Sequence, residues 1–283
     1  MNKELERAIN SAGDLPTIPL VATKIIHLME TETVTAEELA KVVAADPAVA
    51  ARVLKISNSA FYGCQRQIQT LSSAIVTLGF NTLKTLVVTA SVKQVYQPFG
   101  LTEKLLWEHS FAAALAARII AGTTRLADEE EAFLAGLFHD IGKTVMNTLD
   151  RDKFQLAMQL SYNEKISFAE AEKNIFPFCH DDVGAFVIKK WNFPETLIEA
   201  VMQHHRFDFA DANDHYILLL TSIASLADLF CQKLGIGVRE PHQELDLVNC
   251  TGARLCNLSG DQINFLLTTF QETFDKNKNF FMS

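Results

Sequence analysis

The sequence predicts an all-α protein built from two helical parts. Apolar residues recur at intervals of three and four almost throughout the chain, and apolar–polar alternation long enough for a β-strand does not occur. Proline and glycine interrupt the helical pattern at residues 96–100, YQPFG. We therefore expect an N-terminal helical lobe over residues 1–97 and a larger helical core over residues 98–283. The two parts should pack together, because the apolar residues around Leu78 and Leu83 need cover.

Composition and charge restrict the class of protein. The chain has 283 residues, 48% of them hydrophobic, which is enough to bury a sizeable core. A net charge of −9 argues against general binding to a nucleic-acid backbone or to an anionic membrane. The five cysteines are an odd number without CxxC spacing, and the N-terminus lacks the apolar segment of a signal peptide. We expect a cytoplasmic protein with neither a nucleic acid nor a membrane as partner.

The N-terminal part begins with two X–Pro pairs in residues 15–19, LPTIP, which predict an extended lead-in. Thr35 and Glu38 have the spacing of a capping box, and Asp46 precedes a proline at the first position of the next predicted helix. The predicted helices cover residues 21–30, 35–43, 47–58, 71–78 and 82–92.

The second part has longer helical patterns. Asp214 is placed to cap a long apolar helix, which Gly235 should end. Polar residues interrupt that helix at Thr221, Ser225 and Asp228, so we expect it to be buried in the core rather than to span a membrane. The predicted helices cover residues 101–120, 129–149, 181–191, 195–205, 215–234 and 261–274.

Residues 131–143, EAFLAGLFHDIGK, place His139 beside Asp140 at the end of an apolar helical segment, and Lys143 follows three residues later. Neighbouring side chains on a helix can converge on one ion from adjacent ridges. Gly136 and Gly142 flank the pair, and each costs a helix about 1 kcal/mol relative to alanine. These costs suggest that another backbone or a bound group must approach closely. An isolated His–Asp pair is more often an ordinary polar pair at a helix end, so the other histidines must decide.

Five of the eight histidines lie between Trp107 and Arg206, most of them near a predicted helix end. They are His109, His139, His180, His204 and His205. Any one of them alone is more often a hydrogen-bonded structural residue. Asp228 also has an ordinary interpretation, because it shares a helical face with Thr221 and Ser225 that could be a solvated stripe. The ordered set is more specific than its members. Five imidazoles with the carboxylates of Asp140 and Asp228 suit one or two divalent ions of iron, manganese, zinc or nickel.

Several sequence segments together resemble a known family. The segments of the second part are WEHS at 107–110, GLFHDIGK at 136–143, His180 followed by Val183-Gly184, the pair His204-His205, and SLAD at 225–228. They resemble the HD superfamily of metal-dependent phosphohydrolases. In the N-terminal part, LPTIP, DPAV at 46–49, VLKISNSAFYG at 53–63 and SSAIVTLGFNTLK at 72–84 are similar to the HDOD domain, the HD-related output domain of bacterial signalling proteins. The resemblance extends over about residues 15–234.

The resemblance implies an all-α fold in which the N-terminal lobe packs on an HD-type helical core. It assigns four primary metal ligands, His109, His139, Asp140 and Asp228, and leaves His180, His204 and His205 for a second ion. It further implies that Asp140 and Lys143 are catalytic residues, with Lys143 near a substrate phosphate, although a lysine at a helix end is often simply solvated. Residues 206–214, RFDFADAND, lack the Gly-Tyr-Pro signature of related cyclic-di-nucleotide phosphodiesterases, so we do not expect that activity.

Two functions agree with these features. The chain could be an HDOD-type signal-transduction protein that retains an HD-type metal site and acts through a protein partner. It could instead be an active metal-dependent phosphohydrolase of a phosphodiester or nucleotide, with a phosphate-containing small ligand in its site. The sequence contains no recognisable receiver or cyclase domain, so the input signal would come from another protein or a ligand.

Overall fold

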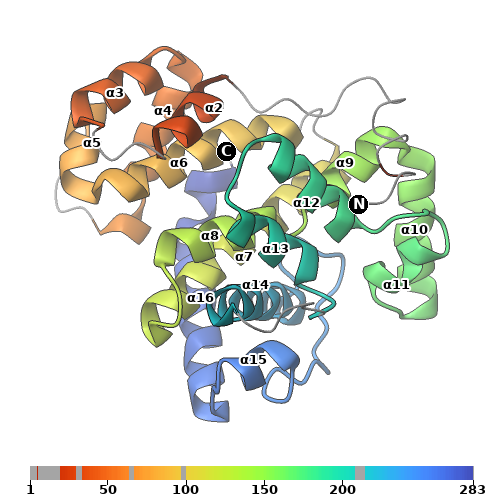
Figure 1. Cartoon of the computed structure of the whole chain (residues 1–283). Helices are drawn as coiled ribbons and strands as arrows, with labels where there is room; N and C mark the ends of the chain where they lie inside the picture. Colours follow the sequence, from red (N-terminus) through yellow and green to blue (C-terminus); the bar gives the residue numbers. More distant parts are fainter. Residues whose placement is uncertain are drawn as a thin grey trace.

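The structure, a computed structural model, describes residues 5, 20–29, 34–63, 67–96, 100–207 and 214–282. Within these residues every regular element is a helix and no strand occurs (Figure 1). The prediction of an all-α fold is therefore confirmed. The predicted lead-in at residues 15–19 lies outside the described residues.

The part of the N-terminal lobe from residue 20 onward that the structure describes contains five α-helices and two short 3₁₀ helices. These are α2 (Leu20–Met29), α3 (Ala36–Ala44), α4 (Pro47–Ser57), η1 (Ala60–Tyr62), α5 (Leu71–Leu78), α6 (Phe80–Val92) and η2 (Lys93–Tyr96). The predicted caps are present. Thr35 and Glu38 form a reciprocal capping box, and the Asp46 carboxylate accepts hydrogen bonds from two backbone N–H groups of α4.

The boundary between α5 and α6 differs from the prediction. We expected residues 79–81 to separate the helices, but only Gly79 does so, and α6 already begins at Phe80. Gly79 has a φ of +85°, a conformation that costs glycine little because it has no Cβ. The chain therefore passes from α5 to α6 through a single non-helical residue.

Within the described residues the core has ten helices, and α14 packs against α7, α8, α13 and α15. The ten helices are α7 (Leu101–Thr124), α8 (Glu129–Phe138), α9 (Ile141–Leu149), α10 (Arg151–Glu164), α11 (Phe168–Lys173), α12 (His180–Lys190), α13 (Glu195–Gln203), α14 (His215–Leu234), α15 (Thr251–Leu255) and α16 (Gly260–Met282). Asp214 caps α14 and Gly235 ends it in a left-handed conformation, as predicted. Among the described helices, only α14 is long and apolar enough to cross a membrane, and its packing against α7, α8, α13 and α15 identifies it as a core helix.

The region predicted as one helix over residues 129–149 is two helices, α8 and α9. The chain breaks helical continuity at His139 and Asp140, which form the turn between them. The prediction that this pair lies on adjacent ridges of one helix was therefore wrong. The break redirects α9 so that it packs against α12. His139 and Asp140 consequently face the interior of the core from the bend between α8 and α9.

The two lobes share one continuous apolar core. Helix α6 contacts α8, and α16 contacts both α4 and η1. Figure 1 shows α16, in blue, running from α15 up to the N-terminal lobe. Residues 97–99 of the predicted junction lie outside the described residues. At its edges, the Tyr96 hydroxyl is 2.8 Å from the Ser110 hydroxyl of α7, and the Gly100 N–H donates to Glu103 at 2.8 Å.

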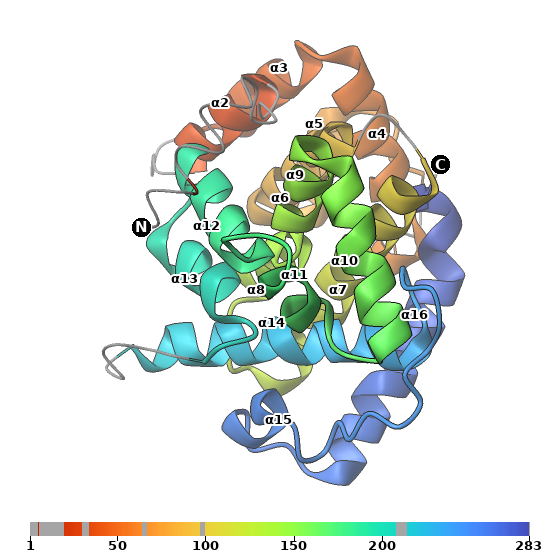
Figure 2. The same cartoon turned by 90° about the vertical axis from the view of Figure 1, so that its right-hand side faces the viewer.

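Helix α10 packs against both α9 and α11 (Figure 2). The sequence patterns did not predict either helix. Ser167 forms a capping box with Glu170 at the start of α11, which fixes where this short helix begins.

Candidate metal centre

The seven predicted donor residues come from separate parts of the core and meet in its interior. His109 projects from α7, His139 and Asp140 form the α8–α9 turn, and Asp228 lies on α14. The remaining donors are His180 at the start of α12 and His204 and His205 directly after α13.

The donors form two groups that could each hold a metal ion. The first group contains His109, His139 and Asp228, and all three side chains are buried. The second contains Asp140, His180, His204 and His205, of which only His205 is exposed. Within each group, one ligand atom from every residue lies within 4.8 Å of the others.

The Asp140 carboxylate joins the two groups. Its Oδ2 lies 3.5 Å from Nε2 of both His109 and His139, which belong to the first group. Its Oδ1 lies 3.2 Å from Nε2 of His180 and 3.8 Å from Nε2 of His204, which belong to the second. The two oxygens of one side chain therefore face two different sets of imidazoles.

Gly136 and Gly142 permit this convergence by letting backbones approach closely. A Cβ at Gly136 would lie 2.5 Å from the carbonyl oxygen of Ala113 in α7, and one at Gly142 would overlap the carbonyl oxygen of His180 in α12. The expectation that another backbone comes close to both glycines is confirmed. The α7–α8 contact brings His139 toward His109, and the α9–α12 contact brings Asp140 toward His180.

The ring nitrogens of His139 and His204 are oriented by backbone carbonyl groups. Nδ1 of His139 lies 2.7 Å from the Gly136 oxygen, and Nδ1 of His204 lies 2.6 Å from the Val201 oxygen. A carbonyl oxygen only accepts hydrogen bonds, so each Nδ1 carries the hydrogen. In the neutral imidazole, Nε2 then has a free lone pair directed toward Asp140.

Four buried polar atoms at the centre make no hydrogen bond to any residue that the structure describes. They are Nε2 of His139, His180 and His204, and Oδ1 of Asp140. A buried polar atom without a partner costs about 1–3 kcal/mol. Divalent cations in the two donor groups would satisfy these atoms, and imidazole with carboxylate is a donor set that iron, manganese, zinc and nickel accept. The residues present therefore fit a metal ion.

Both carboxylates of the centre are ionised. Burial opposes ionisation of Asp140, but Lys143 and the neighbouring imidazoles outweigh it and hold its pKa well below the ordinary value. Burial also opposes ionisation of Asp228, and His109 and His139 likewise hold its pKa well below the ordinary value. Asp228 is only 2% exposed, and Thr221 and Ser225 are buried beside it, so this helical face is not a solvated stripe.

Lys143 is part of the centre rather than a solvated lysine at a helix end. Its Nζ lies 2.6 Å from Asp140 Oδ2, and only 14% of its side chain is exposed. Burial would lower the pKa of Lys143, but Asp140 and Asp228 outweigh burial and raise it above the ordinary value. The side chain, which lies over the ring of Phe168, is therefore a fixed positive charge beside the shared carboxylate.

His205 marks the side of the centre that faces solvent. Its ring centroid lies 4.0 Å from that of His204 and 5.0 Å from that of His180. Arg206 follows it and donates to Asp181 at 2.6 Å while lying 2.9 Å from Asp182, so the end of α13 is tied to the start of α12.

The sequence patterns missed Glu172, a fully buried carboxylate on α11. It accepts a hydrogen bond from Nδ1 of His180 at 2.8 Å. Burial lowers the pKa of His180, but Glu172 outweighs burial and raises it to about 9. When the His180 ring is protonated, its second proton is on Nε2. An ion bound to Nε2 would take the place of this second proton. Glu172 stands eight residues before His180, and nothing in that spacing indicates that the side chains meet.

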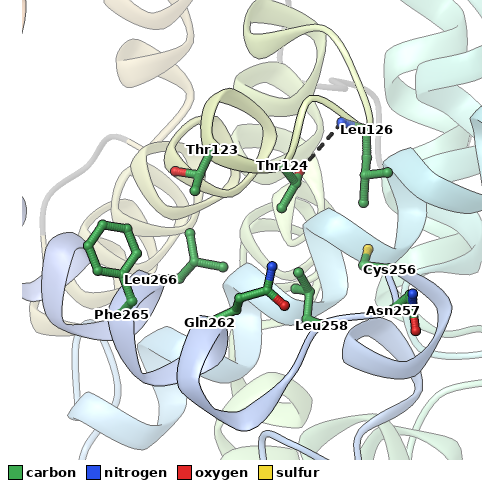
Figure 3. Close-up of a pocket in the computed structure, with 9 residues that line it drawn as sticks. All are labelled: Thr123, Thr124, Leu126, Cys256, Asn257, Leu258, Gln262, Phe265 and Leu266. Carbon is green, nitrogen blue, oxygen red and sulfur yellow. Dashed lines mark hydrogen bonds between the residues drawn. The ribbon is translucent and has the colours of Figure 1, made fainter.

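Two surface pockets lie elsewhere in the fold and contain none of the seven donors. One, of about 190 Å³, is lined by residues from the end of α7, from the α15–α16 turn and from α16 (Figure 3). The other, of about 560 Å³, lies where η1, α5 and α6 of the N-terminal lobe meet α7 and α16. Neither pocket extends to the centre.

Residues 15–207 match the HDOD domain family. The chain belongs to this family, as its motifs had indicated. A protein of uncharacterised function from Treponema pallidum is 24% identical over 226 residues, which are 75% of this chain. The chain spans only 41% of that relative's length.

Solved structures share the fold at low sequence identity. An HDOD domain protein of unknown function from Geobacter sulfurreducens superposes with a TM-score of 0.82 at 23% identity, covering 96% of this chain and 94% of that one. A candidate phosphohydrolase from Shewanella amazonensis superposes with a TM-score of 0.74 at 20% identity, covering 97% and 96% of the two chains. A candidate signal transduction protein from Marinobacter aquaeolei has a TM-score of 0.67 at 19% identity, covering 98% of this chain and 64% of that one.

Proposed function

We propose that this HDOD protein binds two divalent transition-metal ions at the joined donor groups. His109, His139 and Asp228 would hold one ion, and His180, His204 and His205 the other, with Asp140 shared between them. The observation that carries the proposal is the set of buried Nε2 and Oδ1 atoms that face one another without hydrogen bonds among the described residues. Such an arrangement is costly without a cation and favourable with one.

The biological role that we propose is signal transduction through a protein partner in the cytoplasm. Membership of the HDOD family supports this role. In this signalling role, the metal centre would stabilise one arrangement of the core helices, because its ligands come from α7, α12 and α14 and from the turns after α8 and α13. Signalling input would reach the protein from a partner or from a phosphate-containing ligand.

Hydrolysis of a phosphodiester or nucleotide is the second candidate, and the position of Lys143 favours it. A bound ion would supply Lewis acidity to a phosphoryl group and to water. Lys143 would add a positive charge for the phosphoryl oxygens, and Asp140 would hold that charge in place through their 2.6 Å contact. The exposed His205 supports access from solvent on this side.

One experiment tests both candidates. Purified wild type, Asp140→Ala and Lys143→Ala are compared for metal content by mass spectrometry and for metal-dependent turnover of a generic phosphodiester. We expect the wild type to contain metal and Asp140→Ala to lose it, since both groups share this carboxylate. Full metal in Asp140→Ala would contradict the proposed centre.

Lys143→Ala separates the two roles. If the protein is a hydrolase, this variant should keep its metal, since a protonated lysine is a poor ligand. Its turnover should nevertheless fall by about 10²-fold or more, because it loses a charge that stabilises the transition state. Equal rates in wild type and variant would remove Lys143 from the mechanism. An absence of turnover in both would favour the signalling role alone.

A further inference from the structure

The second donor group has a charge deficit that the first does not have. Asp228 belongs to the first group alone, whereas the second group contains only the shared Asp140 as a direct carboxylate. Its other members are the imidazoles of His180, His204 and His205, which are neutral when they bind a metal. A divalent ion in the second group would therefore have less negative charge around it than an ion in the first.

Glu172 places a negative charge directly behind that second group. The side chain is 0% exposed, and both of its oxygens lie within 2.9 Å of Nδ1 of His180. The backbone N–H of His180 donates to the same carboxylate at 3.1 Å. A buried carboxylate is unfavourable unless its partners compensate its charge. Here the compensation comes from two N–H groups of a single residue, one of the predicted ligands.

The other three buried imidazoles of the centre have a different kind of partner. Their Nδ1 atoms face backbone carbonyl oxygens, which carry no net charge, at Gly136, Val201 and Ile236. Among the described donors of the centre, His180 alone is backed by a carboxylate. A carboxylate behind a ligating imidazole fixes its tautomer and increases its basicity.

We infer that Glu172 is the positioning residue of the second ion site, acting through His180. It orients the ring so that Nε2 faces Asp140, and it supplies the negative charge that this group lacks. This inference rests on the proposed two-ion centre. Phe168 on the same helix adds an apolar cover, since its ring centroid lies 6.0 Å from that of His180. Helix α11 thus supports the second site with one charged and one apolar side chain.

The test is a titration of the metal-free full chain with Co²⁺, followed by ion counting and by competition with a chelator. Glu172→Gln removes the charge and keeps the size of the side chain. Glu170→Gln is the matched control, since Glu170 is on the same helix but bonds to Ser167 at the helix start. We expect two ions in the wild type and in the control. In Glu172→Gln, one ion should bind with unchanged affinity and the other about 10–100-fold more weakly.

A second measurement does not require metal. The Nδ1–H proton of His180 should give a strongly downfield NMR signal in the metal-free wild type, because its acceptor is a buried carboxylate. Glu172→Gln should shift this signal upfield and leave those of His139 and His204 in place. Glu172→Asp, which keeps the charge on a shorter side chain, should recover part of the lost Co²⁺ affinity and provides the comparison if Glu172→Gln does not fold.

The outcomes separate the inference from the function on which it rests. If the wild type binds two ions and Glu172→Gln binds both with unchanged affinity, Glu172 has no positioning role and the proposed centre stands. Equal weakening of both ions in Glu172→Gln would also contradict a role specific to the second site. If the wild type binds no Co²⁺, the proposed centre itself is wrong, and the inference is wrong with it.

Discussion

At the scale of single residues, Gly142 controls how closely the two halves of the centre approach. It follows Asp140 by two positions and lies against the backbone of α12 at His180 and Gly184. Because a Cβ at this position would overlap the His180 carbonyl, any larger residue must push α9 and α12 apart. That movement would separate Asp140 from His180 and so divide the second donor group.

We therefore predict that Gly142→Ala destabilises the fold and lowers metal content. Overpacking of this kind costs about 1–3 kcal/mol, and each kcal/mol lowers Tm by roughly 2–4 °C in a chain of this size. The matched control is Gly260→Ala, because the nearest atom to a Cβ there is 3.7 Å away and both glycines lie in the first turn of a helix. The control should be neutral or slightly more stable. Thermal unfolding and metal analysis of both variants would check this, and equal behaviour would show that the contact is not tight.

The sequence indicated the seven candidate donors that the structure brings together, but it did not indicate the residues that support them. The seven donors carry chemistry in their side chains, and their residue types and order along the chain are informative by themselves. Glu172 acts through its contact with His180 of the next helix, and Gly237, in the segment after α14, acts through its contact with His109 of α7. Such contacts between separate elements leave no local pattern.

At the scale of elements, the segment after α14 holds His109 of α7 in place. The carbonyl oxygen of Ile236 lies 3.2 Å from Nδ1 of His109, and Gly237 packs directly on the His109 backbone. Gly237 has a φ of +65°, and a Cβ there would overlap His109. The orientation of one candidate ligand in the first group thus depends on a loop that begins where α14 ends.

We predict that Gly237→Ala lowers the affinity of the first ion site, since its Cβ must displace His109. Gly63→Ala separates this effect from backbone strain. Gly63 has a similar φ of +60°, but a Cβ there meets nothing within 4 Å among the described atoms. Both variants should lose about 1–2 kcal/mol for the left-handed conformation. Only Gly237→Ala should bind Co²⁺ more weakly. If the two variants bind Co²⁺ equally, the loop does not position His109.

The prediction of elements succeeded where caps and long apolar periods were present. Thr35, Asp46 and Asp214 mark helix starts through side-chain hydrogen bonds that depend only on nearby residues. The break at His139 and Asp140 was missed because neither residue disfavours a helix strongly. Tertiary contacts of α9 with α12, rather than local propensity, determine that break. Helix α11 has six residues, which is too few for a helical period to be recognised.

At the scale of the whole molecule, polar contacts supplement the apolar core between the lobes. The Arg118 guanidinium of α7 lies over the rings of Phe61 and Tyr62 in η1, at 5.3 and 5.5 Å from their centroids. Arg118 also pairs with Glu130 of α8 at 2.9 Å. One cation therefore contacts both the N-terminal lobe and the core, and the proposed boundary at residues 97–98 would separate two parts that depend on each other.

Asn277 of α16 joins the last helix to the N-terminal lobe through a hydrogen bond. It is 2% exposed, and its Oδ1 accepts the backbone N–H of Phe61 at 2.8 Å. Its Nδ2 donates to the carbonyl oxygen of Thr273, four residues earlier, at 2.7 Å. Asn174 makes the same bond within its own helical segment, to Glu170 at 3.1 Å, but it is exposed and reaches no second lobe. The two asparagines are thus a matched pair.

We predict that Asn277→Ala weakens the packing between the two lobes, whereas Asn174→Ala does not. Removing Oδ1 leaves the Phe61 N–H without its acceptor, and an unsatisfied buried donor costs about 1–3 kcal/mol. Asn174→Ala, at the surface, should stay within about 0.5 kcal/mol of the wild type. Limited proteolysis at residues 96–100 and thermal unfolding provide the measurements. Asn277→Ala should be cut faster than the wild type, because opening of the lobe contact exposes the junction. If the wild type itself is cut cleanly into two stable, independent pieces, the lobes do not need each other, and this view of their packing is wrong.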